Sequence, residues 1–379
     1  MVPREYDILT CAAAVQPDSG RLEGLRGLVA RGPHMDRLIR TAVREGMAGL
    51  LYKNMERAGA LGMIKPSHRE RLRSLYYATA ASNLNRIHDL KEALLRLGRR
   101  GTQVVLLQGI ALLQQVYHDV GLRPLTDIDL WVIEEDYPDL VNALLVLGYR
   151  RDPLYPFSFR RSATRLEIQT RLPWADRIRA SAMLIGTSQE QIYLRTRLVE
   201  VDGEEARCLG PQDQVLYLGL HALKHNVERM IWLVDIHGLV AGWGPHDWEE
   251  MVARAHELGL ARPLSYILFL LVHLCACRIP EEARVLLEQE GPRSFERMVM
   301  MRIIRRKSLP PWVPLFVMSS GKGIGRRFPF IMENLFPRPE ILRQVFADAP
   351  GGPMWQLYGK RLVQIIEMLR SSLSRKAWG

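Results

Sequence analysis

The sequence predicts an α+β fold in which a central region with strands lies between two helical regions. Three observations predict it: apolar residues recur at helical spacing before residue 100, short runs rich in β-branched residues follow, and helical spacing then returns. A chain of 379 residues can also bury a large core and form two or three structural units. We therefore divide it into an N-terminal helical region (1–100), an α/β core (101–207) and a C-terminal helical bundle (208–379).

The N-terminal region is predicted to be helical from about residue 21 to residue 100. Segments such as MDRLIRTAVREGMAGLLYKNMERA and RERLRSLYYATAASNLNRIHDLKEALLRLGRR place apolar residues three or four positions apart. This spacing gathers the apolar side chains on one face of each helix, which the fold can bury.

The central region predicts a strand, a helix and a second strand in succession. The run TQVVLLQG is short and apolar, IALLQQVYHDVG has helical spacing, and DIDLWVI follows the turn LRPLT and is rich in β-branched and aromatic residues. A further helix is expected in DYPDLVNALLVLGY, where Gly148 closes it. The segment RLEIQTRL alternates polar and apolar residues like a half-buried strand.

The C-terminal region again predicts helices, beginning at Pro211. Four segments with helical spacing follow one another between glycine and proline breaks, ending with RPLSYILFLLVHLCACRI. Prolines and glycines on both sides of an apolar patch predict an irregular connection over 308–328, and a last helix is expected near 354–375. The motif GKGIGRR at 321–327 lacks the spacing and ending of a P-loop, so we interpret it as a basic surface loop that could touch an anionic acceptor.

Composition and charge limit the classes of protein to which the chain can belong. It has 47% hydrophobic and 25% charged residues, as globular proteins do, and no apolar run reaches the roughly 20 residues that cross a bilayer. The N-terminus lacks the apolar core of a signal peptide, so we expect a cytoplasmic protein with no membrane partner. Four unevenly spaced cysteines indicate neither a disulfide framework nor a zinc site. The net charge of +11 favours anionic partners such as nucleotides or RNA.

Asp127 and Asp129 are the strongest candidates for a chemical role. They lie two residues apart on a predicted strand, so their side chains project from the same face and could share one or two magnesium ions. Phosphoryl and nucleotidyl transfer use such pairs, although paired acids at a strand end are often only solvated and sugar transferases carry a similar pair. Gly109 opens a predicted helix eighteen residues upstream, and a helix N-terminus suits a phosphate.

The stretch VVLLQGIALLQQVYHDVGLRPLTDIDLWV resembles the uncharacterised bacterial nucleotidyltransferases of the polymerase-β-like superfamily. Their mark is a strand, Lys-Gly, a helix, and then Arg and Asp-x-Asp. The resemblance extends to LLYKNMERAG upstream, LGPQDQVLYLGLHALKHNVERMIWLVDIHGLV downstream and ENLFPRPEILRQVF near the end. It implies a mixed-sheet core and two bound Mg²⁺ ions, with Mn²⁺ as the alternative metal. It also implies transfer of a nucleoside monophosphate from a triphosphate such as ATP. The acceptor, whether protein, small molecule or RNA, stays open.

The same resemblance implies roles for single residues. Asp127 and Asp129 would bind the metals, and Gly109 would let the backbone approach the triphosphate. Glu167 is the candidate for the third carboxylate, which helps to activate the acceptor hydroxyl. Because Glu167 lies on a strand between Arg165 and Arg171, an exposed glutamate paired with either arginine is the other interpretation.

Three positions depart from the family pattern. Gln108 stands where relatives usually have lysine, Gln169 stands where they often have histidine, and Ile110 replaces a small turn residue. Gln108 keeps a hydrogen-bond donor at the nucleotide site but removes a cation. A protein that binds nucleotide or a partner without turnover is therefore the alternative, and an RNA-tailing enzyme or a sugar transferase is a further one.

Other polar residues could border the nucleotide. Arg123 could contact a phosphate or pair with Asp127. His221, Lys224 and His225 share one face of a predicted helix, where the resemblance suggests that Lys224 meets phosphates. In the same region Asp235 could orient a neighbour, and the equally open interpretation makes His221 and Asp235 hydrogen-bonded residues of the helical core.

Overall fold

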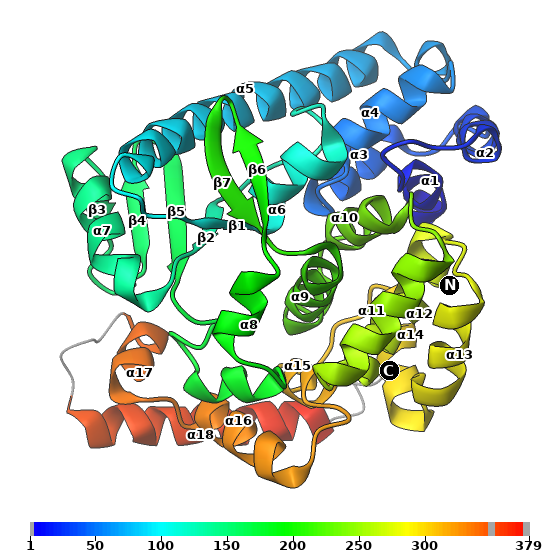
Figure 1. Cartoon of the computed structure of the whole chain (residues 1–379). Coiled ribbons are helices and arrows are strands. Elements are labelled where there is room, and N and C mark those ends of the chain that lie inside the picture. The colour runs from blue at the N-terminus through cyan, green and yellow to red at the C-terminus, as the bar shows by residue number, and fades with distance from the viewer. Residues whose placement is uncertain (1–3, 348–352, 374–379) are drawn as a thin grey trace.

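A computed structural model describes residues 4–347 and 353–373 of the chain (Figure 1). One mixed sheet lies beside a long helix, other N-terminal helices lie near one end of that helix, and most of the C-terminal helices lie beside and below the sheet. The α+β class predicted from the sequence is confirmed.

Seven strands form the sheet in the order β3-β4-β5-β2-β1-β7-β6. Their bounds are β1 (Val105–Leu107), β2 (Ile128–Trp131), β3 (Arg150–Arg151), β4 (Ser158–Arg161), β5 (Thr164–Gln169), β6 (Arg197–Val201) and β7 (Glu204–Cys208). The pairs β2–β5 and β1–β7 are parallel and the other pairs are antiparallel. The strands predicted in TQVVLLQG, DIDLWVI and RLEIQTRL are therefore β1, β2 and β5, side by side with β5 and β1 on either side of β2.

The N-terminal helices pack against one another, and the longest of them also packs against the sheet. Their bounds are α1 (Arg4–Ala12), α2 (Ser19–Ala30), α3 (Met35–Arg44), α4 (Ala48–Arg57) and α5 (Pro66–Gly98). The prediction missed α1 but was correct for the helical stretch that follows. The helix α5 starts at Pro66, whose fixed φ suits the first turn, and runs along the sheet (Figure 1).

Short helices connect the strands at the centre of the sheet. The helix α6 (Gln108–Leu112) follows β1 directly and continues into a π-helical turn over Leu113–Tyr117. The helix α7 (Tyr137–Val146) follows β2, and Gly148 beyond its end has a φ of +83°, a left-handed conformation that glycine adopts without strain. A shorter helix, α8 (Gln189–Leu194), precedes β6.

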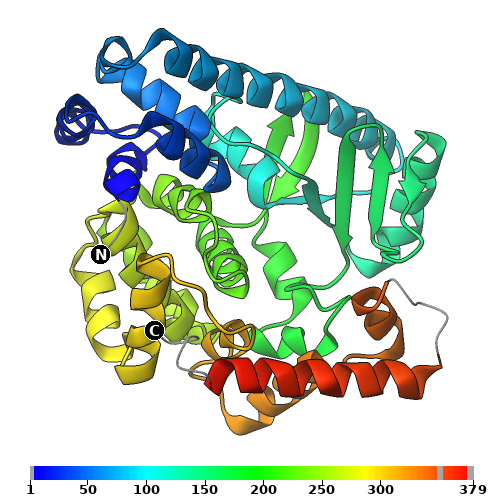
Figure 2. The ribbon, with the colours of Figure 1, turned by 180° about the vertical axis from the view of Figure 1, so that it is seen from behind.

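The four helices predicted from Pro211 onward are α9 (Pro211–Lys224), α10 (Ile231–Val240), α11 (Pro245–Glu257) and α12 (Ala261–Cys275). They are followed by α13 (Glu281–Glu290), α14 (Ser294–Ile304), α15 (Val313–Met318), α16 (Ile324–Leu335), α17 (Pro339–Val345) and α18 (Met354–Leu373). The last of these confirms the predicted final helix, which Figure 2 shows from behind, below the sheet.

The prediction of an irregular connection over 308–328 was wrong in part. Residues Val313–Met318 form α15, and α16 begins at Ile324 within the GKGIGRR motif. The proline and glycine that suggested a break lie where helices tolerate them. Pro314 is in the first turn of α15, and Gly323 is the N-cap of α16.

One hydrophobic core runs through the N-terminal helices, the sheet and the C-terminal helices. It includes Leu9, Leu106 and Val299, from three distant parts of the chain. The predicted division at residues 100 and 207 stays a prediction. Within the described residues, no helix has the length and apolar character that a bilayer crossing demands.

Candidate active site

Three carboxylates lie on or next to two neighbouring strands at the centre of the sheet. Asp129 lies in β2 and is only 9% exposed, whereas Asp127 precedes the strand, is partly exposed, and accepts a hydrogen bond from the Thr126 hydroxyl at 2.9 Å. In the parallel pairing of β2 with β5, Asp129 lies directly opposite Glu167. Since partners in a sheet project from the same face, both side chains belong to one face.

The electrostatics of Asp129 show that these acids interact. Burial raises the pKa of Asp129 well above its usual value, and the negative charges of Asp127 and Glu167 raise it further. Lys224 and Arg123 oppose this rise with their positive charges. The cluster is thus a place where a bound cation would be stabilised.

The pair with Arg165 confirms one interpretation of Glu167, and its role as the third carboxylate stays a prediction. It lies on the acid face beside Asp129, and its carboxylate pairs with Arg165, which also donates to the Ser158 hydroxyl at 3.3 Å. Arg171 pairs instead with Glu134. The carboxylate of Glu167 is therefore near the acids but already bound by one guanidinium.

Arg123 pairs with Asp235 and not with Asp127. Its Nε and Nη2 donate to the two carboxylate oxygens of Asp235 at 2.9 and 2.8 Å, and the Tyr117 hydroxyl donates to the same carboxylate at 2.7 Å. Asp235 is fully buried and Arg123 is nearly so. The neighbour that Asp235 was expected to orient is therefore the guanidinium of Arg123.

Gly109 lies against that guanidinium. A Cβ added at Gly109 would collide with Nη1 of Arg123 and with the side chain of Leu125. The glycine thereby makes room for Arg123 next to the turn after β1. Whether it also admits a triphosphate stays a prediction.

Gln108 and Gln169, the two departures from the family pattern, share one partner. Gln169 Nε2 donates to the Tyr217 hydroxyl at 2.8 Å, and Gln108 also hydrogen-bonds to Tyr217. Gln169 Oε1 accepts from the backbone N–H of Trp174 at 3.1 Å. Gln108 has a φ of +50°, an uncommon conformation for a residue other than glycine at the junction of β1 and α6.

Lys224 lies in the last turn of α9, near enough to the acids for their charges to act on it. Its Nζ lies 4.1 Å from the centre of the Trp174 ring, a cation–π contact. Burial, with a contribution from Arg177, lowers the pKa of Lys224 to about 8, while Asp129 and Glu167 act in the opposite direction. The fold thus brings together the predicted Lys224, Asp129 and Glu167, which are far apart in the sequence.

His221 in α9 and His225, the C-cap residue of that helix, lie on the same side of the helix as Lys224. The rings of His221 and His225 lie 4.9 Å apart and both contact Trp232. Burial lowers the pKa of His221 well below its usual value and that of His225 to about 4, so both are neutral near pH 7. They therefore contribute aromatic surface and hydrogen-bonding nitrogens to the site without adding charge.

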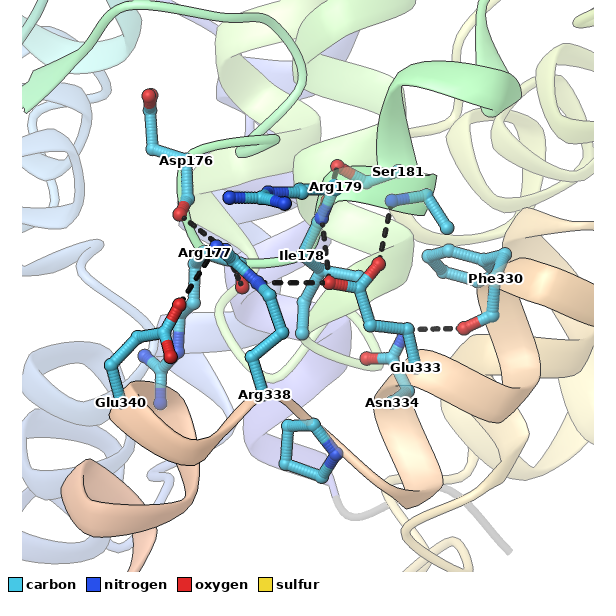
Figure 3. A network of polar contacts seen from close by, with 12 residues as sticks. Asp176, Arg177, Ile178, Arg179, Ser181, Phe330, Glu333, Asn334, Arg338 and Glu340 are labelled. Atoms are coloured by element: carbon cyan, nitrogen blue, oxygen red, sulfur yellow. Dashed lines mark hydrogen bonds and ion pairs between the residues drawn. The ribbon is translucent and has the colours of Figure 1, made fainter.

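The segment after β5 carries Trp174 and Arg177. Hydrogen bonds from residues of the C-terminal region bind this segment (Figure 3). The carboxylate of Glu333 in α16 accepts hydrogen bonds from the backbone N–H groups of Arg179 and Ala180 at 3.0 and 2.7 Å. Arg338, the N-cap residue of α17, donates to the carbonyl of Asp176 at 3.0 Å. Sequence reasoning missed Trp174, Tyr217 and this support, because each depends on contacts between distant segments.

The GKGIGRR motif does not form a phosphate loop. Lys322 donates to the backbone carbonyls of Leu258 and Gly259, and so joins the loop to the end of α11. The prediction that the motif is not a P-loop is therefore correct, but only residues 321–323 lie in a loop, because α16 begins at Ile324.

Asp127, Asp129 and Glu167 have the donor atoms that a magnesium ion needs, but their side chains are not arranged around one position. Carboxylate oxygens are the donors that Mg²⁺ prefers. Within the described part of the chain, no three His, Cys, Asp or Glu side chains form a group arranged to hold a metal. Asp127 and Asp129 supply two donors, and Glu167 would have to leave Arg165 to supply a third.

Comparison with models of protein families matches residues 32–276 to a family described as an uncharacterised nucleotidyltransferase. The chain belongs to this family. The matched range contains every residue of the candidate site described above except Glu333 and Arg338, which bind the segment after β5. No curated protein matches the chain, and no solved structure does. The resemblance to nucleotidyltransferases predicted from the sequence is confirmed.

Proposed function

We propose that this nucleotidyltransferase moves a nucleoside monophosphate from a nucleoside triphosphate to an acceptor hydroxyl. The observation that carries the proposal is the pairing of Asp129 with Glu167 across two parallel strands, with Asp127 and Lys224 beside them. The acceptor oxygen would attack the α-phosphorus, and the bond from that phosphorus to the pyrophosphate leaving group would break.

Asp127 and Asp129 would hold Mg²⁺, with Mn²⁺ as a substitute. When bound, the metal would neutralise charge on the phosphate oxygens. Lys224, protonated near pH 7 because its pKa is about 8, would attract the triphosphate. Glu167, released from Arg165, would accept the proton of the acceptor hydroxyl.

The second candidate is a family member that binds nucleotide without turnover. The observation that favours it is the neutral network of Gln108, Gln169 and Tyr217. In the family pattern, position 108 is usually lysine and position 169 is often histidine. This network would still bind a nucleotide by hydrogen bonds. It would supply neither a cation nor a titrating group.

The test compares the wild-type protein with Asp127→Asn plus Asp129→Asn. Each of the four labelled nucleoside triphosphates is incubated with protein and Mg²⁺, and pyrophosphate release and label transfer to lysate components are measured. The matched control is Glu23→Gln plus Glu288→Gln, which removes two exposed carboxylates elsewhere. Turnover that only the Asp127 and Asp129 variant loses supports the enzyme. Mg²⁺-dependent nucleotide binding with no turnover supports the second candidate.

A further inference from the structure

Three arginines form a row across the edge of the sheet. In the antiparallel pairing of β3 with β4, Arg150 lies opposite Arg160, and in the pairing of β4 with β5, Arg160 lies opposite Arg165. Directly paired residues project from the same face, and so do Arg165 and Glu167, two positions apart on one strand. The arginine row (Arg150, Arg160 and Arg165) therefore lies on the face that holds the acids.

Two members of the row, Arg150 and Arg160, differ in their contacts from the other arginines of β3 and β4. Arg151 donates to the carbonyl of Pro156 and the hydroxyl of Tyr137, and Arg161 pairs with acids of α5. Arg150 and Arg160 are exposed, and their side chains form no ion pair or hydrogen bond with the part of the chain that the structure describes. Like charges placed directly opposite each other destabilise a sheet, so this arrangement costs the protein stability unless an anion binds it.

The arginine row leads from the edge of the sheet to the acids of the candidate site. Neighbouring strands lie about 5 Å apart, so the three guanidinium groups start from positions spread over roughly 10 Å from the sheet edge inward. The inner end is Arg165, which holds Glu167, the partner of Asp129. At the outer end, Arg150 and Arg160 line a hollow of about 650 Å³ at the sheet edge, which Arg151 and Arg161 from the other face and the carboxylate of Asp152 also line.

We propose that the arginine row binds the backbone phosphates of a single-stranded polynucleotide whose terminal hydroxyl is the acceptor. This rests on the proposed function. A polynucleotide end fits the row because evenly spaced phosphates lead away from its terminal hydroxyl in one direction, and arginine binds phosphate with two parallel hydrogen bonds. A hydroxyl on a protein has no such fixed series of anions beside it.

The proposed reaction forms one bond and breaks one. The terminal hydroxyl oxygen forms the new bond to the α-phosphorus while pyrophosphate leaves, and its proton passes to Glu167. The product is a strand longer by one nucleotide, with a new terminal hydroxyl.

The experiment measures binding of a short fluorescent single-stranded RNA, and of DNA of the same sequence, by anisotropy over a series of salt concentrations. The test variant is Arg150→Gln plus Arg160→Gln. The control is Arg26→Gln plus Arg40→Gln, which removes the same charge from α2 and α3, at the opposite end of the molecule (Figures 1 and 2). Thermal melts establish that the variants fold.

We expect the test variant to bind on the order of tenfold more weakly and its salt slope to fall by about 1.4, since each lost contact with a single strand removes about 0.7. The control should match the wild type. No binding by the wild type, or equal losses in both variants, overturns the proposal. Competition by polyglutamate as strong as that by unlabelled RNA also overturns it, in favour of an acidic protein.

Binding is measured without nucleotide or metal, so it does not depend on turnover. Adding nucleoside triphosphates and Mg²⁺ then tests the acceptor role, because the bound strand should lengthen on a gel. Label transfer to another acceptor while the strand keeps its length overturns that role. Absence of any turnover, with binding that the arginine row controls, contradicts the proposed function and the acceptor role but leaves the phosphate-binding row in place.

Discussion

Asp235→Asn should destabilise the protein strongly, because it leaves the charge of Arg123 buried without a counter-ion. Asp235 is 0% exposed and Arg123 is 6% exposed, so water cannot replace the lost carboxylate. The asparagine keeps the shape but turns one acceptor oxygen into an amide that faces the donors of Arg123 and Tyr117. Removing one partner of a buried ion pair typically costs about 3–5 kcal/mol, and we expect a loss of this size.

The measurement is the free energy of unfolding from urea titrations followed by circular dichroism. The matched control is Asp139→Asn, which breaks the pair between Arg100 and Asp139, where the N–O distance is 3.0 Å and the side chains are 43% and 53% exposed. Exposed pairs contribute about 0–1 kcal/mol, so this variant should remain close to the wild type.

A second variant separates charge burial from general damage to the core. Arg123→Met plus Asp235→Leu removes both charges, and apolar replacements of a buried pair are often close to neutral. It should unfold with a smaller loss of free energy than Asp235→Asn alone. A loss below about 1 kcal/mol for Asp235→Asn, or a double variant less stable than the single one, would refute the reasoning.

Three other changes have expected results. Because burial raises the pKa of Asp129 above its usual 3.8, its charge opposes folding above that pH, so Asp129→Asn should stabilise the metal-free protein by about 1–2 kcal/mol at pH 7 and less toward pH 4. Urea titrations at both pH values measure this, and Mg²⁺ should stabilise only the wild type. Nucleotide binding, measured by calorimetry, should weaken as the pH rises through about 8, where Lys224 loses its charge, and Lys224→Gln should remove that dependence. Gly109→Ala should cost about 1–3 kcal/mol, read from the same unfolding titrations, because its Cβ collides with Arg123, whereas Gly27→Ala, with open space around it, should not.

The sequence predicted the elements whose signal is local. Apolar spacing located β1, α6, β2 and α7 in order, and the two-residue interval placed Asp127 and Asp129 at one strand. The hairpin of β6 and β7 also had a local signal that was overlooked. Asp202 and Gly203 both have positive φ at its turn, and Asp-Gly between two extended runs is typical of a tight hairpin.

The rest of the site depends on pairings that no local pattern encodes. Arg123 and Asp235 are 112 residues apart, and either could have paired with several nearer charges. Tyr217 lies on an apolar helix, where a tyrosine is ordinarily a packing residue, and only the fold brings it to Gln108 and Gln169. Such contacts follow from the arrangement of the sheet against α9 and α10, which periodicity does not determine.

The position of Lys224 bears on how the loss of lysine at position 108 is interpreted. A lysine before the turn glycine would supply a cation from the end of β1, and Gln108 supplies none. Lys224 supplies one from α9 instead, close enough to Asp129 and Glu167 for their charges to limit the fall in its pKa that burial causes. Its contact with Trp174, whose backbone N–H donates to Oε1 of Gln169, connects that cation to the glutamine network. The acid cluster thus retains a facing cation, so Gln108 by itself is no argument for a protein without turnover.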